Sequence, residues 1–141
     1  MHAREWIAPA SCRYFVHSVL AAASGESVAS NLPYTDSDLA ALLDFNWYII
    51  VSCNPDGYQY THTDDRMWRK NRADIGQPFC MGVDLNRNFP VGWQTAGGST
   101  SPCVYQYAGA APLDQIESAA WDQWIKDIRG NNYLSNNVRF S

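Results

Sequence analysis

Charged residues are scarce in this sequence. Asp, Glu, Lys and Arg make up 17% of its 141 residues, whereas an average globular domain has about 25%. Hydrophobic residues make up 46%. A disordered tail needs the opposite balance, with low hydrophobicity and high net charge, so that class of protein is excluded. We expect one domain, or part of one, over residues 1–141, because a chain of this length can bury about 70% of its unfolded surface.

Basic residues and long apolar runs are also lacking. The 10 Lys and Arg residues are outnumbered by 14 Asp and Glu, which gives a net charge of −4. This balance argues against a nucleic-acid-binding face and against a polybasic membrane-surface protein. No apolar run approaches the ~20 residues of a membrane span, and the first residues do not form a signal peptide. We therefore expect neither nucleic acid nor a membrane among the partners.

The sequence contains four cysteines and no Cys-x-x-Cys pair, so a structural zinc site is not expected. Cys80 and Cys103 lie in loop-like, proline-flanked sequence, which is a reasonable place for a disulfide. Cys12 and Cys53 lie in apolar segments, where we expect buried free thiols. Three pairings stay open if all four cysteines are used.

Helices are expected to alternate with an apolar strand. Apolar residues recur at helical spacing over residues 8–23 and again over 116–128. Residues 47–51 form a continuous apolar run, which is typical of a strand covered on both faces. Residues 54–57 give a strong turn signal, and residues 58–63 alternate aromatic and polar side chains, which predicts a short strand or extended segment. The pattern predicts an α/β layered architecture.

Two groups of residues have the composition of a functional site. His2 and Glu5 are three positions apart, so an imidazole and a carboxylate could reach one zinc ion. Residues 66–72 contain four cations, and Arg87 lies between two asparagines. Arginine grips carboxylates through its planar fork. Taken singly, each group could instead be an ordinary solvated surface.

Together these motifs resemble the zinc carboxypeptidases of the pancreatic carboxypeptidase A/B family, and they occur in that family's order. The resemblance runs from His2 to about Gly130 and rests on His-Ala-Arg-Glu-Trp (2–6), Asn-Pro-Asp-Gly-Tyr (54–58), Trp-Arg-Lys-Asn-Arg (68–72) and Val-Asp-Leu-Asn-Arg-Asn-Phe (83–89). It implies a partial mixed-sheet α/β/α layered fold, a Zn²⁺ cofactor, and hydrolysis of the last peptide bond of a peptide or protein C-terminus. It also implies a disulfide between Cys80 and Cys103, an extracellular location and a monomer.

The resemblance assigns roles to particular residues. His2 and Glu5 are similar to the family's first two zinc ligands, and Asp84 to the carboxylate that orients the zinc-bound histidine. Arg69 is similar to the arginine that polarises the scissile carbonyl. The residues that resemble substrate-binding positions are Arg4 in the groove and the carboxylate-holding pair Asn86 and Arg87.

The sequence also departs from the family. The expected position of the third zinc-binding histidine falls among Val138, Arg139 and Phe140, none of which can replace it. His17 is expected on the surface of the first helix, and His62 does not lie at a ligand position. The family's catalytic Glu and its specificity pocket belong to a later part of the domain. We therefore expect the chain to be an N-terminal, catalytically incomplete portion.

Two other functions remain open at this point. A zinc acylase could use the same histidine–glutamate and asparagine–arginine motifs on the same scaffold. A non-catalytic pseudoenzyme could keep the carboxylate-binding residues and lose hydrolysis. The presence of both Asn-Pro-Asp-Gly and Trp-Arg-Lys-Asn-Arg favours the peptidase over the acylase.

Overall fold

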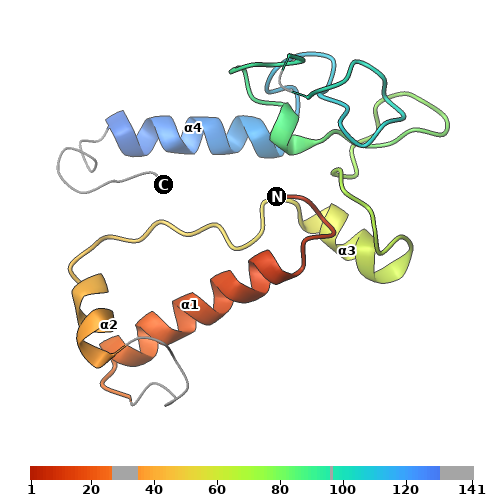
Figure 1. Cartoon of the computed structure of the whole chain (residues 1–141). Coiled ribbons are helices and arrows are strands. Elements are labelled where there is room, and N and C mark those ends of the chain that lie inside the picture. The colour runs from red at the N-terminus through yellow and green to blue at the C-terminus, as the bar shows by residue number, and fades with distance from the viewer. Residues whose placement is uncertain (27–34, 96, 131–141) are drawn as a thin grey trace. The chain divides into compact units, whose positions relative to one another are not determined.

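A computed structural model describes residues 1–26, 35–95 and 97–130 of the chain. Its helices in chain order are α1 (Ile7–Ala23), α2 (Asp36–Leu42), α3 (Pro55–Thr63), the short 3-10 helix η1 (Leu85–Arg87) and α4 (Ile116–Gly130) (Figure 1). The chain divides into two compact units, Trp6–Val51 and Met1–Glu5 with Ser52–Ser141. None of the helices in the described ranges has the length and apolar character that a membrane span requires.

The first unit is built on α1, and the helix predicted over residues 8–23 is confirmed. Pro9 lies in its first turn, where a missing backbone N–H leaves no intrahelical bond unmade. Gly25 follows the end of the helix with φ of +75°. Glycine adopts this left-handed conformation at low cost, and the N–H of Glu26 then bonds to the carbonyl of Ala21 at 3.0 Å. His17 is exposed, as expected.

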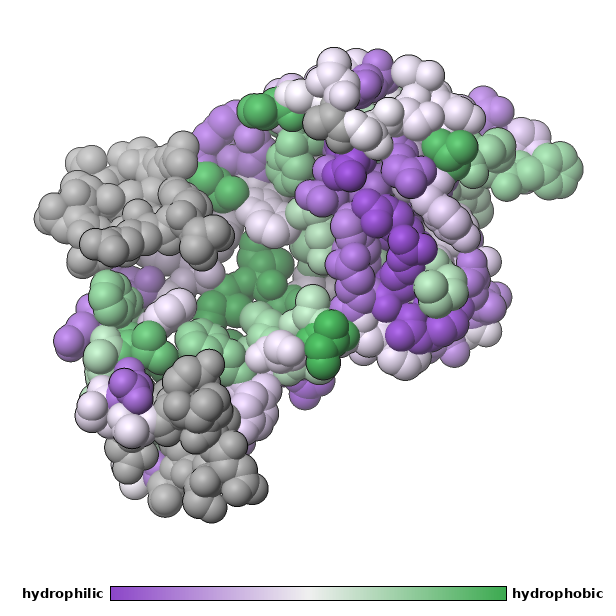
Figure 2. All heavy atoms as spheres, in the orientation of Figure 1, coloured by the Kyte–Doolittle hydropathy of each residue, from purple (hydrophilic) through white to green (hydrophobic). Residues whose placement is uncertain are grey.

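The apolar segment of residues 47–51 follows α2 and runs back beside α1 (Figure 1). Trp47 packs edge-on against Phe15 with ring centroids 5.1 Å apart. Its indole N–H donates to the carbonyl of Leu42 at 2.8 Å. Within the described ranges this segment is extended but has no β-ladder, and its five side chains are 37–46% exposed. Figure 2 shows apolar side chains gathered over this unit. The mixed sheet therefore stays a prediction.

In the second unit, α3 replaces an expected turn and strand. The side chain of Asn54 caps the helix by accepting from the N–H of Gly57 at 3.0 Å, and Pro55 occupies the first helical turn. The turn signal at residues 54–57 thus marks a helix start. The strand predicted for residues 58–63 was wrong, because this cap commits the following residues to a helix.

The buried centre of the second unit is rich in asparagine, and Asn88 is fully buried. Its side chain bonds to the segment that leads into α4: it donates to the carbonyls of Ala108 and Ala111 and to the carboxylate of Asp114, and it accepts from the N–H of Gln115 and the hydroxyl of Ser118. One side chain therefore holds the end of η1 against the start of α4.

The helix α4 forms where the apolar spacing predicted a helix, but it presents a different face to its unit. Ile116 is 84% exposed, whereas Ser118 is buried. Trp121 packs edge-on against Phe89 with centroids 6.3 Å apart. The hydrogen bonds that Asn88 makes to the first turn of α4 fix this orientation.

A disulfide joins Cys80 to Cys103, whose Cα atoms are 4.8 Å apart. Cys12 and Cys53 are free cysteines, as expected, but both are partly exposed rather than buried. The described residues around these two cysteines leave both side chains partly accessible to solvent.

Asn88→Ala is expected to lower the free energy of unfolding by about 3 kcal/mol, because a buried group left without its hydrogen-bond partner costs roughly 1–3 kcal/mol and several partners are lost together. Urea unfolding followed by circular dichroism measures the change. Gln59→Ala, which truncates an exposed amide on α3, is the matched control and should change stability by less than about 0.5 kcal/mol. Equal effects of the two substitutions would contradict the role assigned to Asn88.

Candidate functional site

The predicted site residues come from three segments of the second unit: residues 2–5, the segment that contains Arg69, and residues 84–87. The first is the tight turn of residues 2–5, in which the N–H of Glu5 donates to the carbonyl of His2 at 3.2 Å. Ala3, inside this turn, is buried, and its N–H donates to the carbonyl of Arg69 at 3.1 Å. The amide of Asn54 donates to the carbonyl of Met1 at 3.2 Å. These bonds hold the turn against the segment that contains Arg69.

The imidazole of His2 and the carboxylate of Glu5 converge. Nδ1 of His2 lies 2.7 Å from Oε1 of Glu5. The other ring nitrogen, Nε2, is buried and has no hydrogen bond, although it lies 3.4 Å from Oδ1 of Asp84. The histidine ring is thus placed between an exposed carboxylate on one side and a buried one on the other.

Asp84 is fully buried, and its carboxylate contacts all of the other segments of the site. Oδ2 accepts from Nε and Nη2 of Arg69 at 2.9 and 2.8 Å. Oδ1 accepts from the backbone N–H of Asn86 at 3.0 Å and so caps η1. Burial alone would raise the pKa of Asp84, but the nearby imidazole of His2 and the hydrogen bonds and positive charge of Arg69 outweigh burial and hold its pKa below the usual range.

Asn86 and Arg87 lie side by side on η1. Asn86 is exposed and Arg87 is half-buried. The guanidinium of Arg87 donates through Nη1 to the carbonyl of Asn86 at 3.0 Å and through Nε to the carbonyl of Gly97 at 3.4 Å. An exposed amide next to an anchored guanidinium can bind a carboxylate bidentately.

Arg4 lies within the same turn of residues 2–5 and contacts two neighbouring loops. Its guanidinium lies 5.5 Å from the ring centroid of Tyr105, and Nη1 donates to the carbonyl of Met67 at 3.5 Å. Its own carbonyl accepts from Nη1 of Arg66 at 2.9 Å. Arg4 is therefore fixed to the loops around the turn rather than to the carboxylate of Asp84.

The described residues fit two of the three protein ligands that a catalytic zinc usually takes. His2 and Glu5 present a nitrogen and an oxygen to one point, and Asp84 lies behind the imidazole, as ligand-orienting carboxylates do. Over residues 1–26, 35–95 and 97–130, no group of three His, Cys, Asp or Glu side chains is arranged to hold a metal. The expected position of the third ligand, at Val138 to Phe140, lies outside these ranges.

The sequence analysis missed the structural role of several polar residues. Lys70 belongs to the cationic run, yet it is only 3% exposed. Arg72 stacks on Tyr60, with its guanidinium carbon 3.6 Å from the ring centroid. Asn88 was grouped with the anion-binding residues but is fully buried and structural. The aromatic residues interleaved with these cations were the available signal, because cations stack on aromatic faces.

The chain is similar to known zinc carboxypeptidases over most of its length. A family description, "Zinc carboxypeptidase", matches residues 1–139. The chain is 42% identical over 118 residues to carboxypeptidase B of Astacus astacus, which covers 83% of this chain and 35% of that protein. It is 40% identical over 123 residues to a protein named inactive metallocarboxypeptidase ecm14 from Talaromyces stipitatus, which covers 87% of this chain and 19% of that protein.

The fold is also similar to that of a solved structure. The crystal structure of thrombin activatable fibrinolysis inhibitor matches with a TM-score of 0.75 and 39% identity, over 92% of this chain and 30% of that chain. This similarity supports the expected α/β fold class. The chain spans about a third or less of the length of the three proteins it was compared with, 19–35% in each case.

Asp84→Ala is expected to lower the free energy of unfolding by about 3–5 kcal/mol, because it leaves the nearly buried guanidinium of Arg69 without its counter-charge. Chemical denaturation of the full chain measures this change. Asp122→Ala removes an ion pair between a half-buried carboxylate and the exposed Lys126, one turn apart on α4, and is the control; its cost should stay below about 1 kcal/mol. Similar costs for the two variants would show that Asp84 does not organise the site.

Proposed function

The chain belongs to the zinc carboxypeptidase family, a family of hydrolases, and we propose that it forms the N-terminal part of a metallocarboxypeptidase catalytic domain that removes C-terminal amino acids from peptides. The observation that carries this proposal is the convergence of His2 and Glu5, whose Nδ1 and Oε1 atoms are 2.7 Å apart, in front of the buried Asp84. The neighbouring Arg69, Asn86 and Arg87 supply the groups that a C-terminal substrate needs.

In this proposal, His2 and Glu5 hold zinc, and Asp84 orients the imidazole through Nε2. Zinc, when bound, supplies a water activated for attack on a peptide carbonyl. Arg69 donates hydrogen bonds to the carbonyl oxygen as negative charge develops on it. Asp84 keeps the guanidinium in place, because Nε and Nη2 both bond to the same carboxylate oxygen.

Asn86 and Arg87 recognise the free carboxylate of the substrate, which distinguishes a chain end from an internal peptide bond. Their position on η1 supports this role, because Asp84 caps the helix and fixes both residues relative to Arg69. Arg4 binds the preceding residues of the substrate from its anchored position beside Tyr105. The substrates are therefore peptide or protein C-termini.

We place the protein outside the cell as a monomer. The disulfide between Cys80 and Cys103 supports an oxidising compartment, because disulfides persist there and are rare in the cytosol.

A pseudoenzyme is the second candidate. The described residues bring together two metal ligands rather than three, and one relative carries the name inactive metallocarboxypeptidase ecm14. In that case Asn86, Arg87 and Arg69 would bind a carboxylate without hydrolysing a peptide. Zinc stoichiometry and turnover distinguish the two candidates.

Zinc is expected to bind weakly to this chain, because the described residues bring together two protein ligands where catalytic sites ordinarily use three. Isothermal titration at neutral pH should show loose binding that His2→Ala abolishes. His17→Ala, at an exposed histidine on α1, is the control and should leave binding unchanged. Tight one-to-one binding that survives His2→Ala would overturn the ligand assignment.

The chain by itself is expected not to release C-terminal amino acids. Loss of a general base typically costs ~10²–10⁴-fold in rate, and the two described carboxylates of the site, those of Glu5 and Asp84, already have roles beside His2 and Arg69. The assay uses aromatic-ended and basic-ended peptides with and without a zinc chelator. A longer version of the protein that carries the rest of the domain should be active. Chelator-sensitive release by the pure 141-residue chain would contradict the proposed incompleteness.

A further inference from the structure

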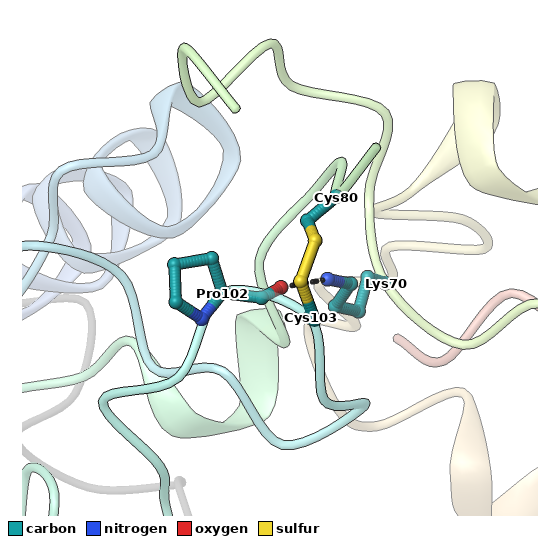
Figure 3. Close-up of a disulfide and its surroundings, with 4 residues drawn as sticks. All are labelled: Lys70, Cys80, Pro102 and Cys103. Carbon is teal, nitrogen blue, oxygen red and sulfur yellow. Dashed lines mark hydrogen bonds between the residues drawn. A yellow bond between two sulfur atoms is a disulfide. The ribbon is translucent and has the colours of Figure 1, made fainter. Parts of the chain in front are cut away.

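The buried lysine beside Arg69 connects the site to the disulfide. Lys70 is only 3% exposed, and its ammonium donates to the carbonyl of Pro102 at 2.8 Å. Pro102 immediately precedes Cys103, which is bonded to Cys80. Figure 3 shows the ammonium bonded to this carbonyl, one residue before the bridged Cys103.

Two aromatic rings of the described residues also lie near the ammonium of Lys70. Its Nζ atom lies 5.7 Å from the ring centroid of Trp68 and 5.9 Å from that of Tyr107. Burial lowers the pKa of Lys70; the charge of Asp84 opposes this effect and that of Arg72 adds to it. A buried cation is costly without a hydrogen-bond partner, so the carbonyl of Pro102 matters to where this side chain rests.

The backbone around Lys70 is held on both sides. The carbonyl of Arg69 accepts from the N–H of Ala3 at 3.1 Å, and the N–H of Asn71 donates to the carbonyl of Val83 at 3.0 Å. The carbonyl of Lys70 accepts from the amide of Asn54 at 3.1 Å. A displacement of Lys70 would therefore be transmitted to Arg69 and to the turn that holds His2 and Glu5.

We infer that Lys70 is a positioning residue. It ties the backbone of Arg69 and the turn of residues 2–5 to the loop closed by Cys80 and Cys103. The redox state of this disulfide therefore controls how firmly the site is held. The importance of this control for catalysis rests on the function proposed for Arg69, whereas the physical link does not. When a dithiol reduces the protein, the S–S bond breaks, two thiols form, and the dithiol closes into its own disulfide.

Reduction frees the loop because a disulfide restricts the conformations open to the residues it closes. The carbonyl of Pro102 then no longer stays at the ammonium of Lys70, and the side chain moves toward water to regain hydrogen bonds. The N–H of Ala3, bonded to the carbonyl of Arg69, is the group that reports this loosening.

Amide hydrogen exchange of the oxidised full chain, followed by NMR, tests the inference without zinc or substrate. Lys70→Met keeps the length of the side chain and removes the donor. It should accelerate exchange of the Ala3 amide by at least roughly tenfold, because hydrogen bonds of charged groups contribute about 1.5–3 kcal/mol, which corresponds to at least that factor. Lys126→Met, at an exposed lysine on α4, is the matched control. The Ala119 amide within α4 should be unchanged in both variants.

Dithiothreitol supplies the second arm. It should accelerate exchange at Ala3 in the wild-type chain and add little in Lys70→Met, because both changes break the same link. Lys70→Arg, which keeps a cationic donor, should restore slow exchange and its sensitivity to dithiothreitol. Effects that add independently in Lys70→Met, or an Ala3 amide that reduction leaves protected in the wild type, would overturn the inference.

The wild-type arm is decisive even if Lys70→Met fails to fold. Selective acceleration at Ala3 on reduction supports the link, and uniform acceleration at Ala3 and Ala119 contradicts it. Since exchange is measured without metal or peptide, failure of the proposed function would appear only in zinc binding and turnover. Failure of the link would appear only in these exchange rates.

Discussion

The buried carboxylate of Asp84 is the interaction on which the site depends. A carboxylate without water needs charged or hydrogen-bonding partners, and here Arg69, the imidazole of His2 and the N–H of Asn86 surround it. Each partner belongs to a different segment of the chain. Satisfying one negative charge therefore also brings together the imidazole of His2, the guanidinium of Arg69 and the helix η1 that carries Asn86 and Arg87.

The second unit consists largely of loops, whose backbone groups need hydrogen-bond partners that a sheet would otherwise supply. Asn54, Asn71 and Asn88 serve this purpose, because each is buried and bonds through its side chain to backbone or side-chain groups of other segments. An asparagine side chain both donates and accepts, so it can satisfy unpaired peptide groups of either kind. Lys70 extends the same arrangement to the disulfide loop.

Local motifs could be predicted from the sequence, whereas the burial of polar side chains and the pairing of strands could not. The spacing of His2 and Glu5 is a local property, and the structure brings their side chains together as that spacing allows. The long first helix was equally readable from its period. The helix α3 was not predicted, because the alternation of aromatic and polar residues over 58–63 is also typical of a strand. In the structure the N-terminal cap at Asn54 favours the helix instead. The aromatic residues near Lys70 in the sequence indicate stacking, but its burial follows from tertiary contacts and could not be predicted locally. The expected sheet depends on strand partners distant in sequence.

X-ray absorption spectroscopy of the zinc-loaded chain tests the central claim, that His2 and Glu5 are placed to share a metal in front of Asp84. The account predicts one imidazole and otherwise oxygen ligands, with metal–ligand distances of about 2.0–2.2 Å. It also predicts that the imidazole contribution disappears in His2→Ala. A sulfur ligand at about 2.3 Å, which the free Cys12 or Cys53 would give, or an imidazole contribution that persists in His2→Ala, would contradict it.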